Sequence, residues 1–191
     1  MDRAVADRPY HHGDLRRALL DEAVAVIAAE GPSVLSLRDL ARRIGVSHAA
    51  PAHHFGDKRG LLGAVAAEGF DLLATALEAA YEHRGDFLEV GLAYVRFAVD
   101  HPAHFEVMFR RDLYAADDEE VQAAERRAEA VLYGPIAALV PGADVVGVGV
   151  AAWSLVHGFA TLWLSGNLPG LLGADADAAA RRVVTKLFVK D

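Results

Sequence analysis

Hydrophobic residues recur three and four positions apart along almost the whole chain, which is the spacing of one face of an α-helix. The first such run starts at Asp14 and stops at Gly31 and Pro32, residues that commonly end helices. The same signals predict eight further helices, over about 36–45, 47–54, 58–82, 87–99, 102–109, 117–140, 144–165 and 175–189. Alternation with a period of two, typical of strands, does not occur. The predicted fold is all-α.

Polar residues at the starts of these segments predict the helix caps. Ser36 followed by Asp39 is a capping-box pattern, and Asp57 is placed to cap the helix that starts at Lys58. Asp117 with Glu120 predicts another capped start. Within the helix that follows, Gly134-Pro135 predicts a kink or a break, because proline removes one backbone hydrogen bond.

The stretch from Ser36 to Lys58 has the length and the turn residues of a helix-turn-helix. Gly45 can adopt the left-handed conformation that ends a helix sharply, and Ser47 can cap the next helix. Ala41 is small where two helices must cross closely. The alternative is an ordinary corner between two helices of a bundle.

The charge distribution favours a nucleic-acid partner for the N-terminal part only. The net charge of the chain is −8, but residues 1–60 hold nine Lys and Arg against eight Asp and Glu, and residues 61–191 hold ten against nineteen. Small basic regions of this kind bind nucleic acid even on acidic proteins. The chain has no cysteine, which excludes thiolate chemistry and fits the reducing cytoplasm. A secretory signal is not expected, since the first thirty residues contain six acidic ones.

Residues 10–15 (YHHGDL), the Ser36–Lys58 motif and the long helix after it resemble the tetracycline-repressor (TetR) family of bacterial transcription regulators. Trp153, His157 and Gly158 are similar to a tryptophan–histidine–glycine motif of one branch of that family. The resemblance implies a cytoplasmic homodimer that acts as a repressor. It also implies a three-helix DNA-binding domain over 1–57 and a helical bundle for dimerisation and ligand binding over 58–191.

The resemblance further implies that residues 47–54 form the recognition helix on double-stranded, palindromic DNA. The implied DNA contacts are Ser36, Arg38, Ser47, His48, Ala49, Ala52, His53, His54 and Lys58. Arg42 and Arg43 are also placed to contact phosphates. The chain departs from the family at Ala52, where most members have a tyrosine that touches the DNA backbone.

Aromatic residues of the C-terminal half are the candidates for a pocket that binds a small hydrophobic effector. The candidate lining is Tyr94, Phe97, Phe105, Met108, Phe109, Trp153, His157 and Phe159. Arg96 and Arg110 are candidate counter-charges for an acidic ligand. The alternative for His157 is a hydrogen-bonded core residue.

The last two helices are predicted to form the dimer interface, so that Val184→Asp would yield monomers or aggregate. The uncharged run that starts at Val145 is long enough for a membrane span, but it lacks flanking Lys and Arg, and no membrane partner is expected. Histidine pairs such as His101 and His104 are candidates for a metal site or for the active site of a helical enzyme. The sequence places no carboxylate that would complete either kind of site. We therefore expect no catalytic residue, metal or cofactor. A helix-turn-helix protein without an effector is the remaining rival.

Overall fold

The computed structural model describes residues 12–139, 144–168 and 170–188 of the chain. These residues form nine α-helices, two short 3-10 helices and no strand, which confirms the predicted all-α fold. The α-helices are α1 (His12–Glu30), α2 (Leu37–Ile44), α3 (Ala50–Phe55), α4 (Lys58–Arg84), α5 (Phe87–Asp100), α6 (Pro102–Met108), α7 (Glu119–Leu139), α8 (Val145–Leu164) and α9 (Ala176–Phe188). The 3-10 helices are η1 (Pro32–Val34) and η2 (Gly170–Leu172). The sequence also predicts a loose N-terminal arm over residues 1–12. Its residues 1–11, and the predicted helix ends at Val140 and Val189, lie outside the described residues.

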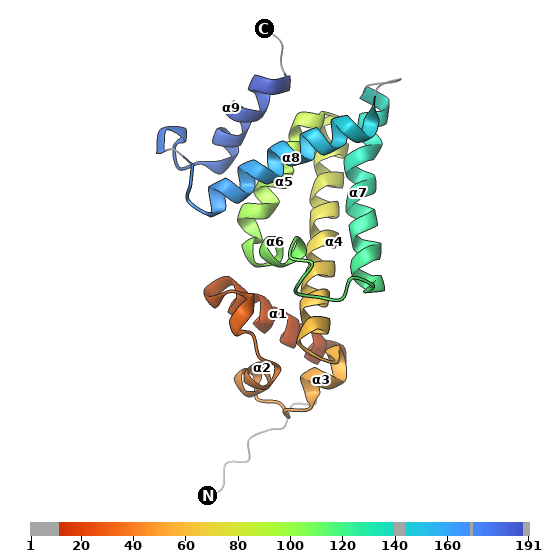
Figure 1. The fold of residues 1–191 in the computed structure, drawn as a ribbon, viewed down its shortest axis with the longest axis vertical. Helices are drawn as coiled ribbons and strands as arrows, with labels where there is room; N and C mark the ends of the chain where they lie inside the picture. Colours follow the sequence, from red (N-terminus) through yellow and green to blue (C-terminus); the bar gives the residue numbers. More distant parts are fainter. Residues whose placement is uncertain (1–11, 140–143, 169, 189–191) are drawn as a thin grey trace, which may run out of the picture.

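The first three helices and the start of α4 form a small head at the lower end of the molecule in Figure 1. Helix α1 packs against α2, α3 and α4, and its buried side chains Leu19 and Ala23 belong to the same core as Leu40 of α2 and Phe55 of α3. Burial of these side chains orients the short helices α2 and α3, which are too short to be stable alone.

The turn between α2 and α3 confirms the role predicted for Gly45. This residue adopts the left-handed conformation with φ of 75°, which costs glycine nothing sterically. The Val46 N–H donates to the Ala41 carbonyl at 2.9 Å and the Gly45 N–H to the Arg42 carbonyl at 3.3 Å. These two bonds form a Schellman motif, which ends α2 and directs the chain into α3.

One predicted helix start in the head is wrong, and at a second the start is confirmed but the predicted cap hydrogen bond is not made. Helix α3 begins at Ala50 rather than at Ser47, because the missing N–H of Pro51 removes the bond that the Ser47 carbonyl would accept. Residues 48 and 49 form only a turn, which the Ala50 N–H closes onto the Ser47 carbonyl at 3.0 Å. The Ser36 side chain makes no cap hydrogen bond, and the Asp39 carboxylate instead accepts from Arg42 and Arg43.

Helix α4 is the spine of the molecule and connects the head with the body (Figure 1, yellow). The Asp57 side chain accepts from the Gly60 N–H at 2.9 Å, so the predicted cap is confirmed. Over its 27 residues α4 packs first against α3 and α1, then against α6, α5 and α7. A displacement of α4 therefore moves the head relative to the body.

The body is a bundle in which α4, α5 and α7 lie side by side, α8 crosses over α5 and α7, and α9 packs against α5 and α8 (Figure 1). The start of α7 is capped by Asp118 rather than Asp117, because the Asp118 side chain accepts from the N–H groups of Glu120 and Val121. Of the kink or break predicted at Gly134-Pro135, the break does not occur. Helix α7 continues through Pro135 to Leu139, so proline costs one backbone hydrogen bond near the C-terminal end of the helix.

The outer face of α8 is apolar and uncovered. Four of the seven large hydrophobic residues exposed in the described part of the chain lie on α8. They are Val146, Val150, Leu162 and Leu164. Helices α4 and α8 are both long and apolar enough to cross a membrane, but 67% of the α4 segment is buried inside the protein against 28% of α8. Helix α4 is thus a core helix, whereas α8 leaves an apolar face exposed.

Candidate nucleic-acid interface and ligand cavities

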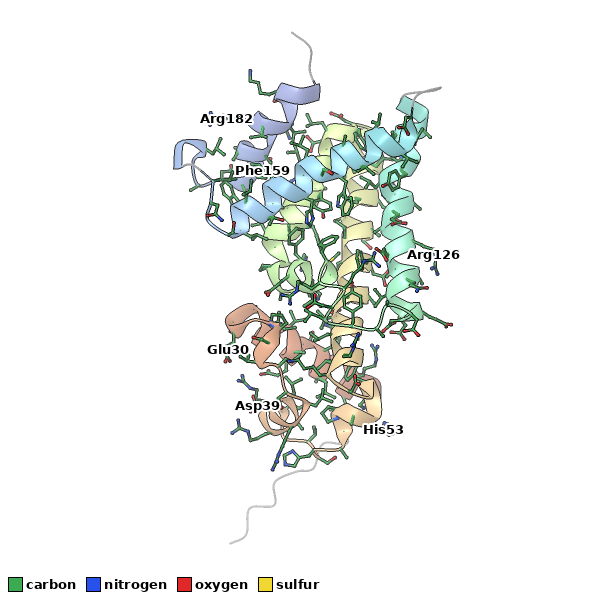
Figure 2. All side chains as sticks on the ribbon, viewed as in Figure 1. Glu30, Asp39, His53, Arg126, Phe159 and Arg182 are labelled. Carbon is green, nitrogen blue, oxygen red and sulfur yellow. The ribbon has the colours of Figure 1, made fainter. Side chains whose placement is uncertain are left out.

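The outer face of α3 and of the turn before it is made of exposed small and imidazole side chains. Figure 2 shows His53 at the lower tip of the molecule. The exposed residues are His48, Ala49, Ala52 and His53, which the sequence predicts to face the DNA groove. Pro51 and Phe55 are buried in the head. A helix with so small an outer surface can reach the floor of a major groove, where alanine meets a thymine methyl group and histidine makes one hydrogen bond to a base edge.

The other predicted DNA-contact residues surround this face. Ser36, Arg38 and Ser47 are exposed, whereas His54 and Lys58 are half-buried. Arg38 makes none of the side-chain hydrogen bonds or ion pairs found in the described part of the chain. Its guanidinium group is therefore available for a base or a phosphate.

Two of the basic groups predicted to bind phosphate already have protein partners. Arg43 pairs with Asp39 at 2.7 Å and with Glu22 and Glu30 of α1 at 3.4 and 3.5 Å. Arg42 also pairs with Asp39, and the two guanidinium groups lower the pKa of the Asp39 carboxyl group. Arg43 thus braces α2 against α1, and only Arg42, whose side chain is 74% exposed, remains open to an incoming phosphate.

Lys58 holds the head together at the start of α4. Its Nζ donates to the Ser33 carbonyl at 2.8 Å, which ties α4 to η1. An ammonium group has three donors, so two remain for phosphate oxygens.

Polar contacts connect the head with the body at three places. Arg59 of α4 donates to the Tyr114 carbonyl at 2.7 Å, and the Tyr114 hydroxyl donates to the Met108 carbonyl at 2.6 Å. Arg17 of α1 pairs with Glu68 of α4. The same Glu68 carboxylate lies 3.1 Å from Nε2 of His104 on α6.

The third connection is made by Arg16 of α1, whose guanidinium lies 5.3 Å from the centre of the Phe55 ring and 3.5 Å from the Glu120 carboxylate of α7. A guanidinium over an aromatic ring is a favourable cation–π arrangement. Arg16 thus contacts the recognition helix and the body at the same time.

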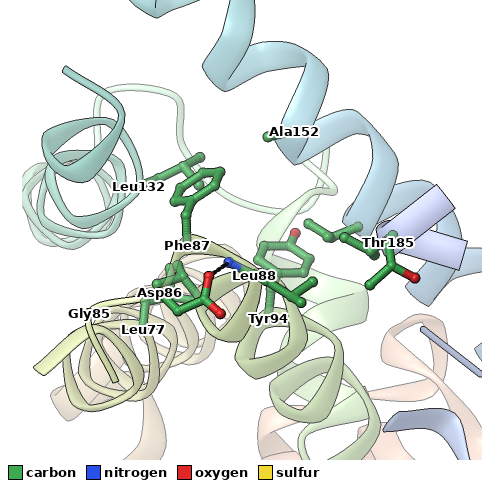
Figure 3. A pocket seen from close by; sticks show the side chains of 13 residues that line it. Leu77, Gly85, Asp86, Phe87, Leu88, Tyr94, Leu132, Ala152 and Thr185 are labelled. Carbon is green, nitrogen blue, oxygen red and sulfur yellow. Dashed lines mark hydrogen bonds between the residues drawn. The ribbon is translucent and has the colours of Figure 1, made fainter. Parts of the chain in front are cut away.

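Besides a more polar hollow of about 670 Å³ lined by α4, α5 and α9, two apolar cavities lie between the helices of the body among the described residues. The larger has a volume of about 440 Å³ and is bounded by α4, α5, α7, α8 and α9, and Figure 3 shows it from close by. The smaller, of about 290 Å³, is bounded by α4, α5, α7, α8 and the end of α6. Leu77, Tyr94 and Leu132 belong to the walls of both. The two cavities are therefore neighbours. The volume of the larger lies within the lower range of ligand pockets, and that of the smaller lies at its lower limit.

Five of the eight predicted pocket residues line the smaller cavity. They are Tyr94, Met108, Phe109, Trp153 and His157. Phe105 packs behind them, with its ring 5.2 Å from that of His157. Phe159 is stacked on Trp163, and Phe97 lies on another side of α5, against His101.

The sequence did not reveal the part of the wall that α4 and α7 contribute. These residues are Phe70, Leu73, Leu77, Ala128, Leu132 and Tyr133. Their spacing along two amphipathic helices is that of ordinary core positions, so only the packing of α4 against α7 distinguishes them. Arg111 lines the smaller cavity and pairs with Glu125, whereas Arg96 and Arg110 line neither cavity.

A chain of hydrogen bonds crosses the wall of the smaller cavity. Nε1 of Trp153 donates to the Tyr94 hydroxyl oxygen at 3.2 Å, and that oxygen lies 2.9 Å from Nδ1 of His157. Burial raises the pKa of the Tyr94 hydroxyl and lowers the pKa of the His157 ring. Both side chains are therefore neutral near pH 7.

Among the residues that the structure describes, no three His, Asp or Glu side chains come together as metal ligands. The rings of His101 and His104 lie 5.8 Å apart, and His104 contacts Glu68 alone among acidic groups.

Comparison with known families gives two matches. The family described as "Bacterial regulatory proteins, tetR family" matches residues 19–65, which include α2 and α3. The family described as "Tetracyclin repressor-like, C-terminal domain" matches residues 87–187, more than half of the chain. A search of curated proteins gives no match.

Solved structures share the whole fold. A protein of unknown function from Rhodococcus sp. RHA1 is 34% identical over 95% of this chain and 97% of its own, with a TM-score of 0.80. A TetR-family transcriptional regulator from Pectobacterium atrosepticum is 24% identical over 95% of this chain and 94% of its own, with a TM-score of 0.65. The TetR-family regulator PfmR from Thermus thermophilus is 24% identical over 86% of this chain and 93% of its own, with a TM-score of 0.67.

Proposed function

Since the chain belongs to the TetR family of DNA-binding transcriptional regulators, we propose that it is a cytoplasmic, homodimeric repressor released from a palindromic operator by a small hydrophobic effector. The hypothesis of an effector rests on the two apolar cavities in the body, which lie next to helices that contact the head. A helix-turn-helix protein without an effector, the rival hypothesis, has no need of such cavities. In this proposal the DNA-binding domain ends at residue 57, and the domain for ligand binding and dimerisation starts at residue 58.

The chain belongs, in this proposal, to the branch with the tryptophan–histidine–glycine motif. Trp153 and His157 are four residues apart on α8, and both line the smaller cavity. A Cβ atom added at Gly158 would meet no other atom within 4 Å, so the space beside this position is open. The motif thus contributes to a ligand site on one face of α8.

The DNA contacts follow from the exposed face of the head. His48, Ala49, Ala52 and His53 enter the major groove, and Arg38 contacts a base or the backbone beside them. Ser36, Ser47, His54 and Lys58 contact phosphates at the margins, which sets the register without selecting sequence. Two heads of a dimer present these faces to half-sites about 34–36 Å apart.

Effector binding acts on the head through α6 and α4. Met108 and Phe109 lie in the cavity wall, and the Met108 carbonyl is bonded to Tyr114, which Arg59 of α4 contacts in turn. A ligand that displaces Met108 or Phe109 alters this path to the head. Operator release requires only that the ligand favour the non-binding arrangement by a few kcal/mol.

The dimer forms through the uncovered face of α8, with α9 beside it. The outward positions of α9 are polar, among them Arg182 and Lys186, whereas Val184 is buried in the chain itself and lines the larger cavity. Val184→Asp would therefore disturb the protomer, and α8 is the correct place to test the interface.

The operator can be identified by selection of random double-stranded DNA with the purified protein. We expect a palindrome, and we expect Arg38→Ala to weaken binding of it about tenfold, since a well-placed arginine contact contributes about 1–3 kcal/mol. Fluorescence anisotropy measures this affinity. Arg126→Ala, on the exposed side of α7 (Figure 2), is the matched control and should bind normally. Full affinity of the Arg38 variant would argue against this face.

Substitutions in α3 and at the start of α4 separate sequence recognition from phosphate binding. We expect His53→Ala to relax the preference for one base position. We expect Lys58→Ala to weaken binding to all sequences alike, and to reduce the slope of log affinity against log salt concentration by about one. Ala52→Tyr restores the backbone contact usual in the family and should tighten binding. The same anisotropy titrations, over a series of salt concentrations, measure all three. Unchanged affinity and preference in the first two variants would refute the assignment of the recognition helix.

A further inference from the structure

The hydrogen-bond chain in the smaller cavity fixes the position of the proton on His157. An indole Nε1–H is a donor only, so the Tyr94 oxygen accepts from Trp153. The single proton of the Tyr94 hydroxyl is then available for Nδ1 of His157, 2.9 Å away. Because Nδ1 accepts, the neutral imidazole ring carries its proton on Nε2.

This Nε2–H group has no hydrogen-bond acceptor among the described residues. The one fully buried side-chain nitrogen or oxygen without a partner, in that part of the chain, is Nδ1 of His104, so Nε2 of His157 is not sealed inside the protein. His157 belongs to the cavity wall, so a molecule in the cavity lies beside its ring. The Phe109 ring, 4.6 Å from the imidazole, offers at best a weak π acceptor.

The rest of the wall determines what kind of molecule can supply the acceptor. Apolar and aromatic side chains form most of it, six of them from α4 and α7. The charged groups at its margin are Arg111, Glu125 and Glu129, and Arg111 already pairs with Glu125. The remaining charge is negative, which disfavours an anionic ligand.

We propose that this cavity selects an uncharged, largely aromatic molecule through one oxygen acceptor, such as a ketone carbonyl, bound by the Nε2–H group of His157. The proposal rests on the effector site of the proposed function and specifies the chemical class of its ligand. Tyr94 and Trp153 act as positioning residues, since they hold the proton on the nitrogen that faces the cavity. A neutral N–H donor recognises an uncharged oxygen without offering a carboxylate the full charge of an Arg or Lys.

A matched pair of rigid probes tests the proposal. Fluorenone and fluorene have nearly the same shape, but only fluorenone has a carbonyl group. In equilibrium dialysis with the full-length protein we expect fluorenone to bind about tenfold more tightly, as one neutral hydrogen bond contributes about 1 kcal/mol or slightly more. Fluorenone-2-carboxylate is expected to bind more weakly than fluorenone.

Variants assign the effect to His157. In His157→Phe the two probes should bind equally, and in Tyr94→Phe the preference should shrink two- to threefold because the tautomer is no longer fixed. His83→Phe, on the exposed end of α4 and outside both apolar cavities, is the control and should keep the full preference. Nitrogen-15 NMR of the imidazole rings, assigned with the His157→Phe variant, should show the Nε2–H form at pH 7.

The outcomes distinguish this inference from the proposed function. Equal binding of both probes to the unaltered protein, tighter binding of the carboxylate, or an Nδ1–H ring would overturn the inference alone and leave an apolar effector site. Failure of both probes to bind at their solubility limits would count against the cavity as an effector site, and the inference would fall with it.

Discussion

The double substitution Val150→Asp, Leu162→Asp is expected to convert the protein from dimers to monomers and to lower its affinity for a palindromic operator at least 100-fold. Both residues are on the free face of α8, with exposures of 43% and 46%. In a two-fold symmetric dimer each substitution places two carboxylates in an apolar contact, and burial of an unpaired charge costs several kcal/mol. The loss of DNA affinity follows because separate heads no longer bind two half-sites together.

Sedimentation velocity at micromolar concentration measures the assembly, and circular dichroism tests whether the variant remains folded. Leu72→Asp is the matched control, because Leu72 is also an exposed large hydrophobic residue but lies on α4. It should remain a dimer. A monomeric unaltered protein, or a dimeric double variant, would refute the interface. An unaltered protein that sediments with membranes would instead indicate that α8 is inserted in a bilayer.

Local chemistry explains why most of the fold follows from the sequence. The Asp57 cap and the Gly45 turn depend on residues within five positions of one another, and both are confirmed. The family matches confirm a helix-turn-helix regulator rather than an enzyme. The wrong predictions arise where two local options compete. Asp118 caps α7 in place of Asp117, and Asp39 binds arginines rather than closing a capping box.

The cavities depend on contacts between distant helices, and the sequence indicates only five of the fourteen residues that line the smaller one. Trp153 and His157 were recognisable from their spacing and their unusual residue types. Phe70 of α4 and Tyr133 of α7 were not, because an aromatic residue on an amphipathic helix usually belongs to the core. The ion pairs of Arg43 in the head could not be predicted for the same reason. Its three carboxylate partners come from α1 and α2, and nothing in the local sequence links Glu22 with Arg43.

Glu68→Gln is expected to lower the free energy of unfolding by about 2 kcal/mol at pH 7, since a largely buried carboxylate that accepts from His104 and pairs with Arg17 loses its charge. The Glu68 side chain is 20% exposed and that of His104 only 7%. The hydrogen bond from His104 and the ion pair with Arg17 lower the pKa of Glu68 to about 2, from an ordinary value of 4.5. Glu78→Gln on the same helix removes an exposed pair with Arg127 and should cost about 0.5 kcal/mol or less.

The pH dependence of the free energy of unfolding tests directly whether the charge on Glu68 is the source of this stabilisation. Because the pKa of Glu68 is lower in the folded than in the unfolded protein, its contribution is complete above about pH 5 and is lost as the pH falls towards 2. Urea unfolding at pH 7, 5 and 3.5 should therefore show a difference between the unaltered protein and the Glu68 variant that shrinks with acid. A difference that stays constant, or a Glu78 variant that behaves identically, would exclude the charge as its source.

The contacts of Glu68 also stabilise the connection between head and body. The carboxylate joins α1 of the head, through Arg17, with α6 of the body, through His104. Helix α6 ends at Met108, in the wall of the smaller cavity. In Glu68→Gln we expect the amides of α1 to exchange with deuterium faster than in the unaltered protein, because local opening needs less free energy once the pair is lost. The Glu78 variant should leave exchange in α1 unchanged. Faster exchange confined to α4, with α1 unaffected, would show that Glu68 stabilises its own helix without holding the head.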